Sequence, residues 1–183
     1  MDELIDIVDA KGNPTGKTAL KSDIHKNGWY HNTIHLWLYT PKGEILLQQR
    51  SHKKTIYPLL WDVSVAGHID AGETFTEAAI RETEEEIGLN LNKKYLIKIG
   101  THLHKSEYNN GNIKDYEFHQ VYISKLPVSL ESLIPQEDEV EALKLVSLDT
   151  FESLLSNSET NSHFIASNKR YYEFVLKNIK AQL

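Results

Sequence analysis

The sequence predicts an α+β fold in which short strands and helices are layered as an α/β/α sandwich. Segments of alternating apolar and polar residues are separated by Gly, Pro and Asn, which is typical of strands joined by turns. Helical patterns occur once in the middle of the chain and again at its end. At 183 residues, 40% of them hydrophobic and 25% charged, the chain is long enough to bury one core. We therefore expect a single domain over residues 1–183.

The strands are predicted in chain order. LIDIV at residues 4–8 alternates ahead of the turn residues Gly12 and Asn13, which predicts an N-terminal strand and hairpin within residues 1–30. The residues PKGE form the turn of a second hairpin. The further strands are expected at residues 34–40, 45–50, 61–67, 95–104, 115–124 and 142–148.

The C-terminal region, residues 150–183, is predicted to hold two helices. Residues 150–157 and 169–183 carry apolar side chains at helical spacing. The apolar face expected for the second helix consists of Tyr171, Phe174, Val175 and Ile179.

A central helix is predicted between Thr74 and Gly88. Thr74 and Glu77 have the spacing of a capping box, and Gly88 supplies the left-handed conformation that ends a helix. Thr76, Ile80, Thr83 and Ile87 fall on one face of this helix at roughly helical spacing.

Three glutamates, Glu82, Glu85 and Glu86, lie at i, i+3 and i+4 and project from one patch of this helix. Each like-charged pair costs a few tenths of a kcal/mol, and the helix C-terminus adds roughly 0.3–1 kcal/mol against each nearby anion. A bound cation would make the arrangement favourable instead of unfavourable, because Mg²⁺ and Mn²⁺ prefer carboxylate oxygens. The alternative is a solvated acidic face, since Glu is a good helix former. The Gly-rich loop ending at Glu73, with Arg81 just before the glutamates, favours the metal.

Residues 67–89 resemble the Nudix box, G-x5-E-x7-R-E-U-x-E-E-x-G-U, in which U is a bulky aliphatic residue. The matching positions are Gly67, Glu73, Arg81, Glu82, Glu85, Glu86, Gly88 and Leu89. One position departs from the pattern, because Thr83 stands where the family has an aliphatic residue. The resemblance implies a mixed sheet packed between helices, and a pair between Glu73 and Arg81 that braces the loop against the helix. It also implies that the three glutamates hold the metal.

The similarity extends beyond this motif. Residues 31–68, HNTIHLWLYTPKGEILLQQRSHKKTIYPLLWDVSVAGH, look like the isopentenyl-diphosphate isomerase branch of the superfamily, which includes both isomerases and hydrolases. With the N-terminal hairpin, the similarity covers most of residues 1–150. The isomerases have a Cys just before the Gly-His pair, where this chain has Ala66. Because isomerisation needs an acid and a base on opposite faces of the alkene, Ala66 disfavours it.

Several metal-site positions of the isomerases also have matches in this chain. They are His25, His31, His68, Asp115 and Glu117. Imidazole and carboxylate groups together suit a transition metal, Mg²⁺ or Mn²⁺, so the resemblance implies a second metal site that includes His68 and Glu117. The alternative is that these histidines are hydrogen-bonded packing residues, since the chain has nine His in all. The sequence leaves this choice open.

Arg50 and Lys54 are candidates for binding phosphate. They follow a strand at the place where the isomerase branch holds a diphosphate, and the fork of an Arg side chain suits phosphate oxygens. The alternative for both is solvation in a loop. Four aromatic residues are candidates for a pocket wall, or else for the core or a lid: Trp29, Tyr30, Trp37 and Trp61.

The composition narrows the class of protein. The net charge of −6 argues against a surface for nucleic-acid polymers or anionic membranes. The absence of Cys excludes disulfides, thiolate zinc sites and Cys nucleophiles. The acidic start MDELIDIVDAKG lacks the apolar core of a signal peptide, and no apolar run is long enough to span a bilayer. We expect a cytoplasmic enzyme, monomer or homodimer, that acts on a small molecule.

The predicted function is metal-dependent hydrolysis of a diphosphate linkage. Mg²⁺ or Mn²⁺ on the three glutamates, with the backbone carbonyl of Ala66 or Gly67, would neutralise phosphate oxygens and activate a water molecule. Glu82 is the first candidate for the general base and Glu117 the second. Two alternatives are a prenyl-diphosphate isomerase and a non-catalytic diphosphate-binding module. The sequence does not select among nucleoside triphosphates, nucleotide sugars, dinucleotides, thiamine-type diphosphates and prenyl diphosphates.

Overall fold

The computed structural model describes residues 2–165 and 168–183 of the chain. The strands in this part are β1 (Leu4–Val8), β2 (Pro14–Leu20), β3 (His31–Tyr39), β4 (Glu44–Arg50), β5 (Trp61–Asp62), β6 (Val65–His68), β7 (Ile97–Tyr108), β8 (Ile113–Lys125) and β9 (Val140–Ser147). The helices are α1 (Lys21–Asn27), α2 (Phe75–Ile87), α3 (Leu148–Ser156) and α4 (Lys169–Lys180), with short 3₁₀ turns η1 (Lys93–Tyr95) and η2 (Leu130–Ser132). The nine strands of the described residues join one mixed sheet.

β3 is the central strand of that sheet. One edge of β3 pairs in parallel with β8, so that His31 lies opposite Glu117 and Thr33 lies opposite His119. The other edge pairs antiparallel with β6, and the ends of β3 reach β1 and β4. β7 extends the sheet beyond β8, while β5 and β9 pair with β4. This topology places polar residues of β3 and β8 side by side.

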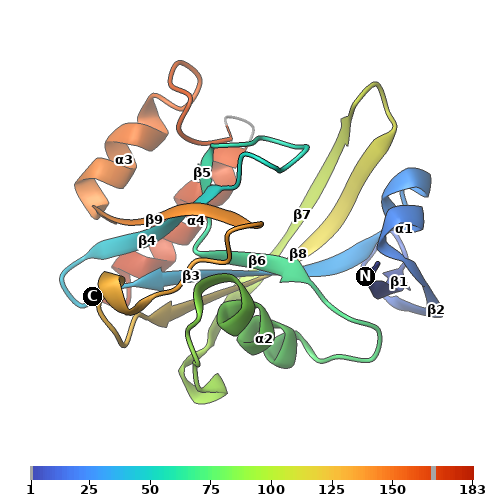
Figure 1. Cartoon of the computed structure of the whole chain (residues 1–183), viewed down its shortest axis with the longest axis horizontal. Coiled ribbons are helices and arrows are strands. Elements are labelled where there is room, and N and C mark those ends of the chain that lie inside the picture. The colour runs from blue at the N-terminus through green and yellow to red at the C-terminus, as the bar shows by residue number, and fades with distance from the viewer. Residues whose placement is uncertain (1, 166–167) are drawn as a thin grey trace.

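Helices cover both faces of the sheet. Trp37 and Tyr39 of β3 contribute to a core that includes Phe151 of α3 and several residues of α4. Leu36 and Leu38 point the opposite way, as successive strand residues do, and contribute to a core shared with α2. Figure 1 shows α2 on one side of the sheet and α3 and α4 on the other. The predicted α+β sandwich with a mixed sheet is confirmed.

One expected strand is interrupted. Residues 61–67 form two short strands, β5 and β6, which are separated by Val63 and Ser64. The Ser64 hydroxyl donates to Leu46 O at 2.6 Å and accepts from Leu38 N at 2.8 Å. A side chain therefore supplies contacts to β3 and β4 that a continuous ladder would otherwise provide.

Two further features differ from the sequence pattern. The N-terminal hairpin of β1 and β2 is present, but α1 follows it, and this seven-residue helix buries only Ile24. On α4, Phe174 is 38% exposed, whereas the other three residues of its expected apolar face are buried. The Phe174 ring lies over Gly100 of β7, and the buried face is completed by Tyr172 and Leu176. The apolar face of α4 is thus rotated slightly from the predicted one.

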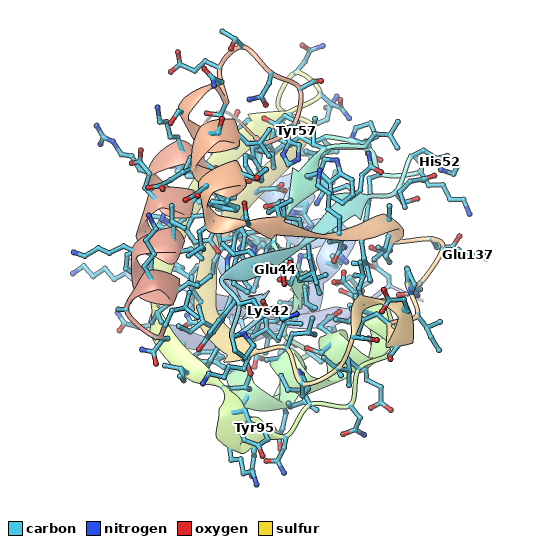
Figure 2. All side chains as sticks on the ribbon, turned by 90° about the vertical axis from the view of Figure 1, so that its left-hand side faces the viewer. Lys42, Glu44, His52, Tyr57, Tyr95 and Glu137 are labelled. Atoms are coloured by element: carbon cyan, nitrogen blue, oxygen red, sulfur yellow. The ribbon has the colours of Figure 1, made fainter. Side chains whose placement is uncertain are left out.

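Figure 2 shows Tyr57 and Tyr95 at opposite ends of the molecule, with side chains filling the layers between them. Tyr57 belongs to the loop between β4 and β5, which borders a cavity of about 550 Å³. Among the helices of the described residues, none is long and apolar enough to cross a membrane.

Candidate active site

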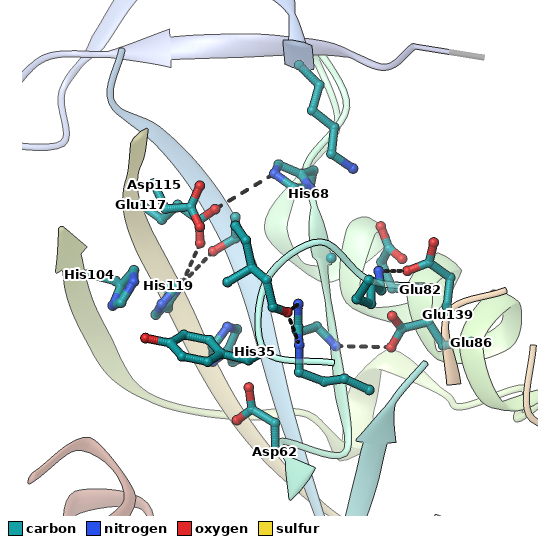
Figure 3. A pocket seen from close by; sticks show the side chains of 18 of the residues that line it. His35, Asp62, His68, Glu82, Glu86, His104, Asp115, Glu117, His119 and Glu139 are labelled. Carbon is teal, nitrogen blue, oxygen red and sulfur yellow. Dashed lines mark hydrogen bonds and ion pairs between the residues drawn. The ribbon is translucent and has the colours of Figure 1, made fainter. Parts of the chain in front are cut away.

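A cavity of about 550 Å³ lies against β3, β6, β8 and α2. In Figure 3 a group of glutamates lies on one side of it, and imidazoles lie on the other side together with the carboxylates of Asp115 and Glu117. The residues that mark these two sides are Glu82, Glu86 and Glu139, and His35, His104 and His119. The cavity is therefore a polar one, assembled from elements that are far apart in the sequence.

The α2 helix positions the glutamates. The Thr74 side chain accepts from Glu77 N, and the Glu77 side chain accepts from Thr74 N, so the expected capping box is present. Gly88 has a φ of 66° and ends the helix as predicted. Thr83, at the position where the motif has an aliphatic residue, is buried and donates to Ala79 O at 2.5 Å. Its hydroxyl is therefore satisfied within the helix.

Arg81 connects α2 with the loop that precedes it. Its Nε and Nη2 donate to the two carboxylate oxygens of Glu73, at 3.0 and 2.8 Å, and Nη2 also donates to His68 O at 3.0 Å. Its Nη1 donates to Glu82 at 2.8 Å and to Glu85 at 3.1 Å. These bonds, the one to Glu73 first, raise the pKa of Arg81. The pair between Arg81 and Glu73 is thus in contact, and its role in catalysis stays a prediction.

The three glutamates differ in burial. The Glu85 side chain is 54% exposed, whereas that of Glu82 is 14% exposed and Glu86 is 5% exposed. Burial raises the pKa of Glu82 to about 7, although Arg81 opposes this shift. Burial and the charge of Glu82 raise the pKa of Glu86 to about 8. Two carboxylates therefore lie where their negative charge is poorly stabilised by the protein alone.

The backbone of β6 lies close to both buried carboxylates. A Cβ atom on Gly67 would overlap the carboxylate of Glu82, so only glycine leaves room for this side chain. Ala66 N donates to Glu86 Oε2 at 3.1 Å. The neighbouring acceptors orient the Gln48 amide so that its nitrogen donates to the same oxygen at 3.2 Å. Both carboxylates are therefore held in place against the end of β6.

This group of side chains fits a hard divalent cation. Mg²⁺ and Mn²⁺ prefer carboxylate oxygens, and a cation would offset the charge that burial leaves on Glu82 and Glu86. The ligands predicted for this ion, namely Glu82, Glu85, Glu86 and the carbonyl of Ala66 or Gly67, all border the cavity, as do the further predicted ligands His68 and Glu117. Their binding of metal stays a prediction.

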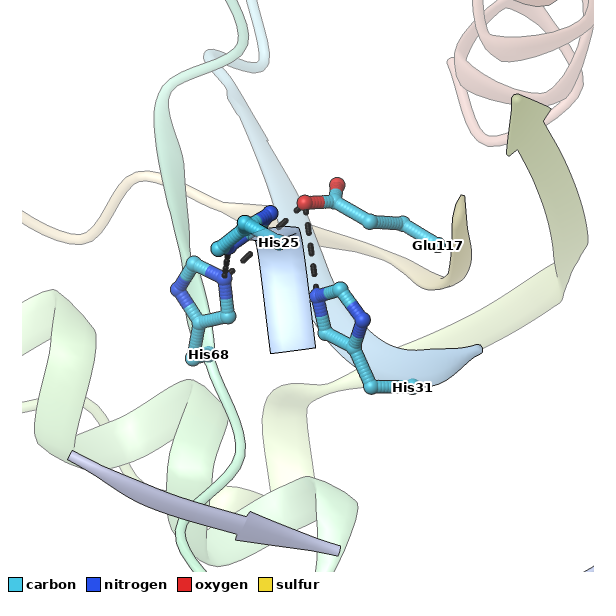
Figure 4. A group of neighbouring side chains, drawn as sticks. All are labelled: His25, His31, His68 and Glu117. Atoms are coloured by element: carbon cyan, nitrogen blue, oxygen red, sulfur yellow. Dashed lines mark hydrogen bonds and ion pairs between the residues drawn. The ribbon is translucent and has the colours of Figure 1, made fainter. Parts of the chain in front are cut away.

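A second group of candidate ligands lies nearby, shown in Figure 4. It consists of His25, His31, His68 and Glu117, whose ligand atoms all lie within 4.8 Å of one another. His25 Nε2 is 3.2 Å from His68 Nε2, and His31 Nε2 is 3.5 Å from Glu117 Oε1. Ligand atoms on a tetrahedral ion with bonds of about 2.1 Å lie about 3.4 Å apart. The spacing therefore suits a cation.

The hydrogen bonding of this second group supports the same interpretation. His31 Nε2 is buried and has no hydrogen-bond partner in the described part of the chain. Burial opposes ionisation of Glu117, but the adjacent His31 and further imidazoles hold the pKa of Glu117 well below its usual range. Asp115 lies outside the group, with its Oδ1 2.9 Å from His25 Nδ1. Asp115 is therefore placed to orient His25 rather than to bind an ion.

Arg50 and Lys54 both border the cavity. Arg50 Nε and Nη2 donate to Ile56 O, at 3.1 and 2.9 Å, and Lys54 contacts the carboxylate of Glu139. Burial lowers the pKa of Lys54, and the charge of Arg50 adds to that effect. Both cations thus lie beside the cavity with protein partners, and their contact with phosphate stays a prediction.

The aromatic candidates lie elsewhere. Trp37 is part of the core, and Trp29 is 40% exposed. None of the four aromatic candidates is among the described residues that border the cavity. The bordering residues that the sequence motifs do not single out include His35, Tyr57, Asp62, His104, Tyr108 and His119. The available signal was weak, namely a polar residue such as His35 within an otherwise apolar strand.

Comparison with known proteins identifies the family. The family model of the NUDIX domain matches residues 29–167. The chain belongs to the Nudix family. Its membership confirms the resemblance carried by residues 67–89.

Two relatives and one solved structure extend this finding. Nudix hydrolase 3 of Arabidopsis thaliana is 35% identical over 161 residues, which cover 86% of this chain but only 21% of the relative's length. Isopentenyl-diphosphate Delta-isomerase 2 of Photorhabdus laumondii is 33% identical over 158 residues, covering 86% of this chain and 85% of the relative. The crystal structure of DR0079 from Deinococcus radiodurans has a TM-score of 0.69 at 20% identity and covers 93% of this chain and 98% of that one. It shows the same fold.

Proposed function

We propose that this Nudix protein hydrolyses a diphosphate linkage in a small organic molecule, with Mg²⁺ or Mn²⁺ held by Glu82, Glu85 and Glu86. One observation carries the proposal. Two buried carboxylates on α2, Glu82 and Glu86, border a polar cavity beside a glycine that makes room for one of them. A backbone carbonyl, of Ala66 or Gly67, is the proposed additional ligand.

The residues around this site have separate roles. When bound, the ion neutralises phosphate oxygens and lowers the pKa of the attacking water. Arg81 and Glu73 hold α2 against the loop that leads into it, which fixes the positions of the glutamates. Glu82, with a pKa of about 7, is the first candidate for accepting the proton of the water. Glu117, which borders the same cavity, is the second candidate.

Cationic side chains are available for the diphosphate. Lys21, Arg50 and Lys54 all border the cavity, which is lined by a larger number of carboxylates. Arg50 offers a planar fork and the lysines offer point charges, both of which suit phosphate oxygens. Because Lys54 contacts Glu139, it exchanges one anionic partner for another when phosphate binds.

The isomerase alternative has support and opposition. The second ligand group and the similarity to a Photorhabdus isomerase favour it. Ala66 opposes it, because a methyl group does not exchange protons with carbon. The non-catalytic alternative is opposed by the Nudix box, in which every charged position is kept. Hydrolysis is therefore the function that the site supports best.

We also propose that His25, His31, His68 and Glu117 hold a second divalent cation. Metal content after dialysis against Zn²⁺ or Mn²⁺ tests this without an activity assay. His31→Gln should lose about one ion per chain, whereas the exposed His52→Gln should lose none. Equal metal content in these two variants would remove the second site.

The hydrolase proposal is tested with a panel of diphosphate compounds. Nucleoside triphosphates, nucleotide sugars, dinucleotides, thiamine-type and prenyl diphosphates are incubated with Mg²⁺ or Mn²⁺, and phosphate and monophosphate are measured. We expect turnover that EDTA abolishes and that Glu85→Gln reduces strongly. Glu84→Gln is the matched control, because Glu84 is exposed on the same helix and does not border the cavity. No turnover of any compound would contradict the proposal.

Two broader expectations stay proposals. One is the cytoplasmic location expected from the sequence. A monomer or homodimer is tested by size-exclusion chromatography with light scattering, in which a higher assembly would contradict the expectation.

A further inference from the structure

The side of the cavity opposite the glutamates is lined by polar side chains. Such a surface is a poor contact for a hydrocarbon group of a ligand. We call it the polar wall and define it as His35, Asp62, His104 and His119. His35, Asp62 and His119 are only 8%, 8% and 4% exposed, so their polar atoms are held within the protein rather than in bulk water. A group bound in the cavity meets these atoms directly.

The two central imidazoles of the polar wall are fixed by hydroxyl groups. His35 Nδ1 lies 2.7 Å from the Tyr171 hydroxyl, which also accepts from Trp37 Nε1 at 2.9 Å. His119 Nδ1 lies 2.7 Å from the Thr33 hydroxyl. The Nε2 atoms of both rings make no hydrogen bond with the described residues and are not enclosed by protein. Each ring therefore offers one free nitrogen to a ligand.

The faces of these rings are already covered. The His35 and His119 rings stack with centroids 3.9 Å apart and an angle of 17° between their planes. His104 stacks on His119 from farther away, at 5.6 Å and 21°. A flat aromatic ligand would thus find edges rather than open faces here, and edges of imidazole form hydrogen bonds.

Asp62 adds a fixed acceptor to the polar wall. Its Oδ1 accepts from Val63 N at 2.8 Å and from the Tyr172 hydroxyl at 2.9 Å. Its Oδ2 has no protein partner among the described residues and is not sealed from the cavity. A carboxylate oxygen held in this way favours a ligand with O–H or N–H donors.

The position of the polar wall relates it to the phosphate chemistry. His35 lies opposite Ala66, and Thr33 lies opposite His68, in the pairing of β3 with β6. The residues of β6 in turn lie against Glu82 and Glu86. Because the glutamates and the polar wall border one cavity, a diphosphate bound at the glutamates would place its organic group in the space that the polar wall lines.

A prenyl tail and a sugar would have opposite effects on the free energy of binding at the polar wall. A prenyl tail would remove water from the Asp62 carboxylate and from two imidazole nitrogens without giving them new partners, which is unfavourable. Adjacent hydroxyls of a sugar donate to a carboxylate oxygen and exchange hydrogen bonds with imidazole edges.

Resting on the proposed hydrolase function, we propose that the polar wall makes this site specific for diphosphates whose organic group bears hydroxyls, such as a pentose or hexose. Asp62, His35 and His119 are the specificity-determining residues, and they select against prenyl diphosphates.

The test compares ADP-ribose and UDP-glucose with isopentenyl and geranyl diphosphate. Wild-type protein with Mg²⁺ should have kcat/KM at least about tenfold higher for one of the sugar compounds than for either prenyl compound. Asp62→Asn keeps the Oδ1 acceptor and replaces Oδ2 with an amide. It should raise KM for the preferred sugar compound about tenfold, change kcat much less, and leave KM for prenyl compounds unchanged. Asp149→Asn, exposed on α3, is the matched control.

The outcomes separate the inference from the function on which it rests. The inference would be overturned if prenyl compounds were hydrolysed as efficiently as sugar compounds. It would also be overturned if Asp62→Asn left KM for the preferred sugar compound unchanged. Neither result would contradict hydrolysis itself. No hydrolysis of any compound would overturn the function. Calorimetric binding of UDP-glucose and geranyl diphosphate to wild-type protein then decides the inference, since tighter binding of the prenyl compound would refute it. If Asp62→Asn does not fold, the preference of the wild-type protein between the two classes of compound is the deciding measurement.

Discussion

Replacing Glu86 by Gln perturbs the proposed metal site with little change in shape. The Gln side chain keeps an oxygen that accepts from Ala66 N, so the backbone contact of β6 with α2 is retained. What it removes is the ability to ionise. Activity at limiting Mg²⁺ should fall by about one to two orders of magnitude, because a charged ligand is lost from the proposed site.

The same substitution should stabilise the metal-free protein. Burial first, and then the charge of Glu82, raises the pKa of Glu86 from 4.5 to about 8 in the folded state. The folded state therefore holds a proton that the unfolded chain releases, and stability falls as the pH rises from about 4.5 to about 8. At about 1.4 kcal/mol per pH unit, wild type loses up to about 3 kcal/mol by pH 7, and Glu86→Gln avoids this loss.

Urea unfolding in EDTA at pH 4 and at pH 8 measures the difference. Glu86→Gln should match wild type at pH 4 and exceed it at pH 8, whereas Glu84→Gln on the exposed side of α2 should match wild type at both. Mg²⁺ should stabilise wild type more at pH 8 than at pH 5, because metal binding needs the ionised carboxylate. A stability gap that does not depend on pH, together with near-wild-type activity at limiting Mg²⁺, would refute the assignment of Glu86.

Three further substitutions or substrates test other parts of the site. Arg81→Ala should lower both the melting temperature and the rate, with about 1–2 kcal/mol lost, because Glu73 loses a forked partner and Glu82 loses one donor; an unchanged melting temperature and rate would show that the brace is dispensable. Gly67→Ala should fold but lose most activity, because its methyl group would displace the Glu82 carboxylate, and near-normal turnover would contradict that placement. Wild-type protein with isopentenyl diphosphate in D₂O should give no allylic product and no deuterium at carbon by NMR, since Ala66 carries no exchangeable proton; metal-dependent deuterated dimethylallyl diphosphate would restore the isomerase.

Local patterns account for the parts of the site that the sequence predicts. The capping box of Thr74 and Glu77, the stop at Gly88, and the spacing of the glutamates are all set within one helix. Their contacts follow from helix geometry, so a sequence pattern describes them well. The contact of Arg81 with Glu73 spans a short loop and follows from the family resemblance.

The polar wall depends on register, which the sequence does not contain. His119 meets Thr33 because β8 pairs in parallel with β3, and His35 meets Tyr171 because α4 packs across β3. These contacts join residues far apart in the chain. Asp62 similarly lies at the end of β5, where an expected strand is interrupted at Val63 and Ser64. The misplaced Phe174 has the same origin, since helical spacing defines a face only to within about one residue.

The central claim, metal-dependent hydrolysis at the glutamates of α2, is tested most directly by the source of the oxygen in the product. The preferred diphosphate is incubated with wild-type protein in H₂¹⁸O, with and without Mg²⁺, and the phosphate products are analysed by mass spectrometry. The account predicts one ¹⁸O atom in a single phosphate product per cleavage, no reaction in EDTA, and a strongly reduced rate in Glu86→Gln. Incorporation that continues in EDTA, or at the wild-type rate in Glu86→Gln, would contradict it.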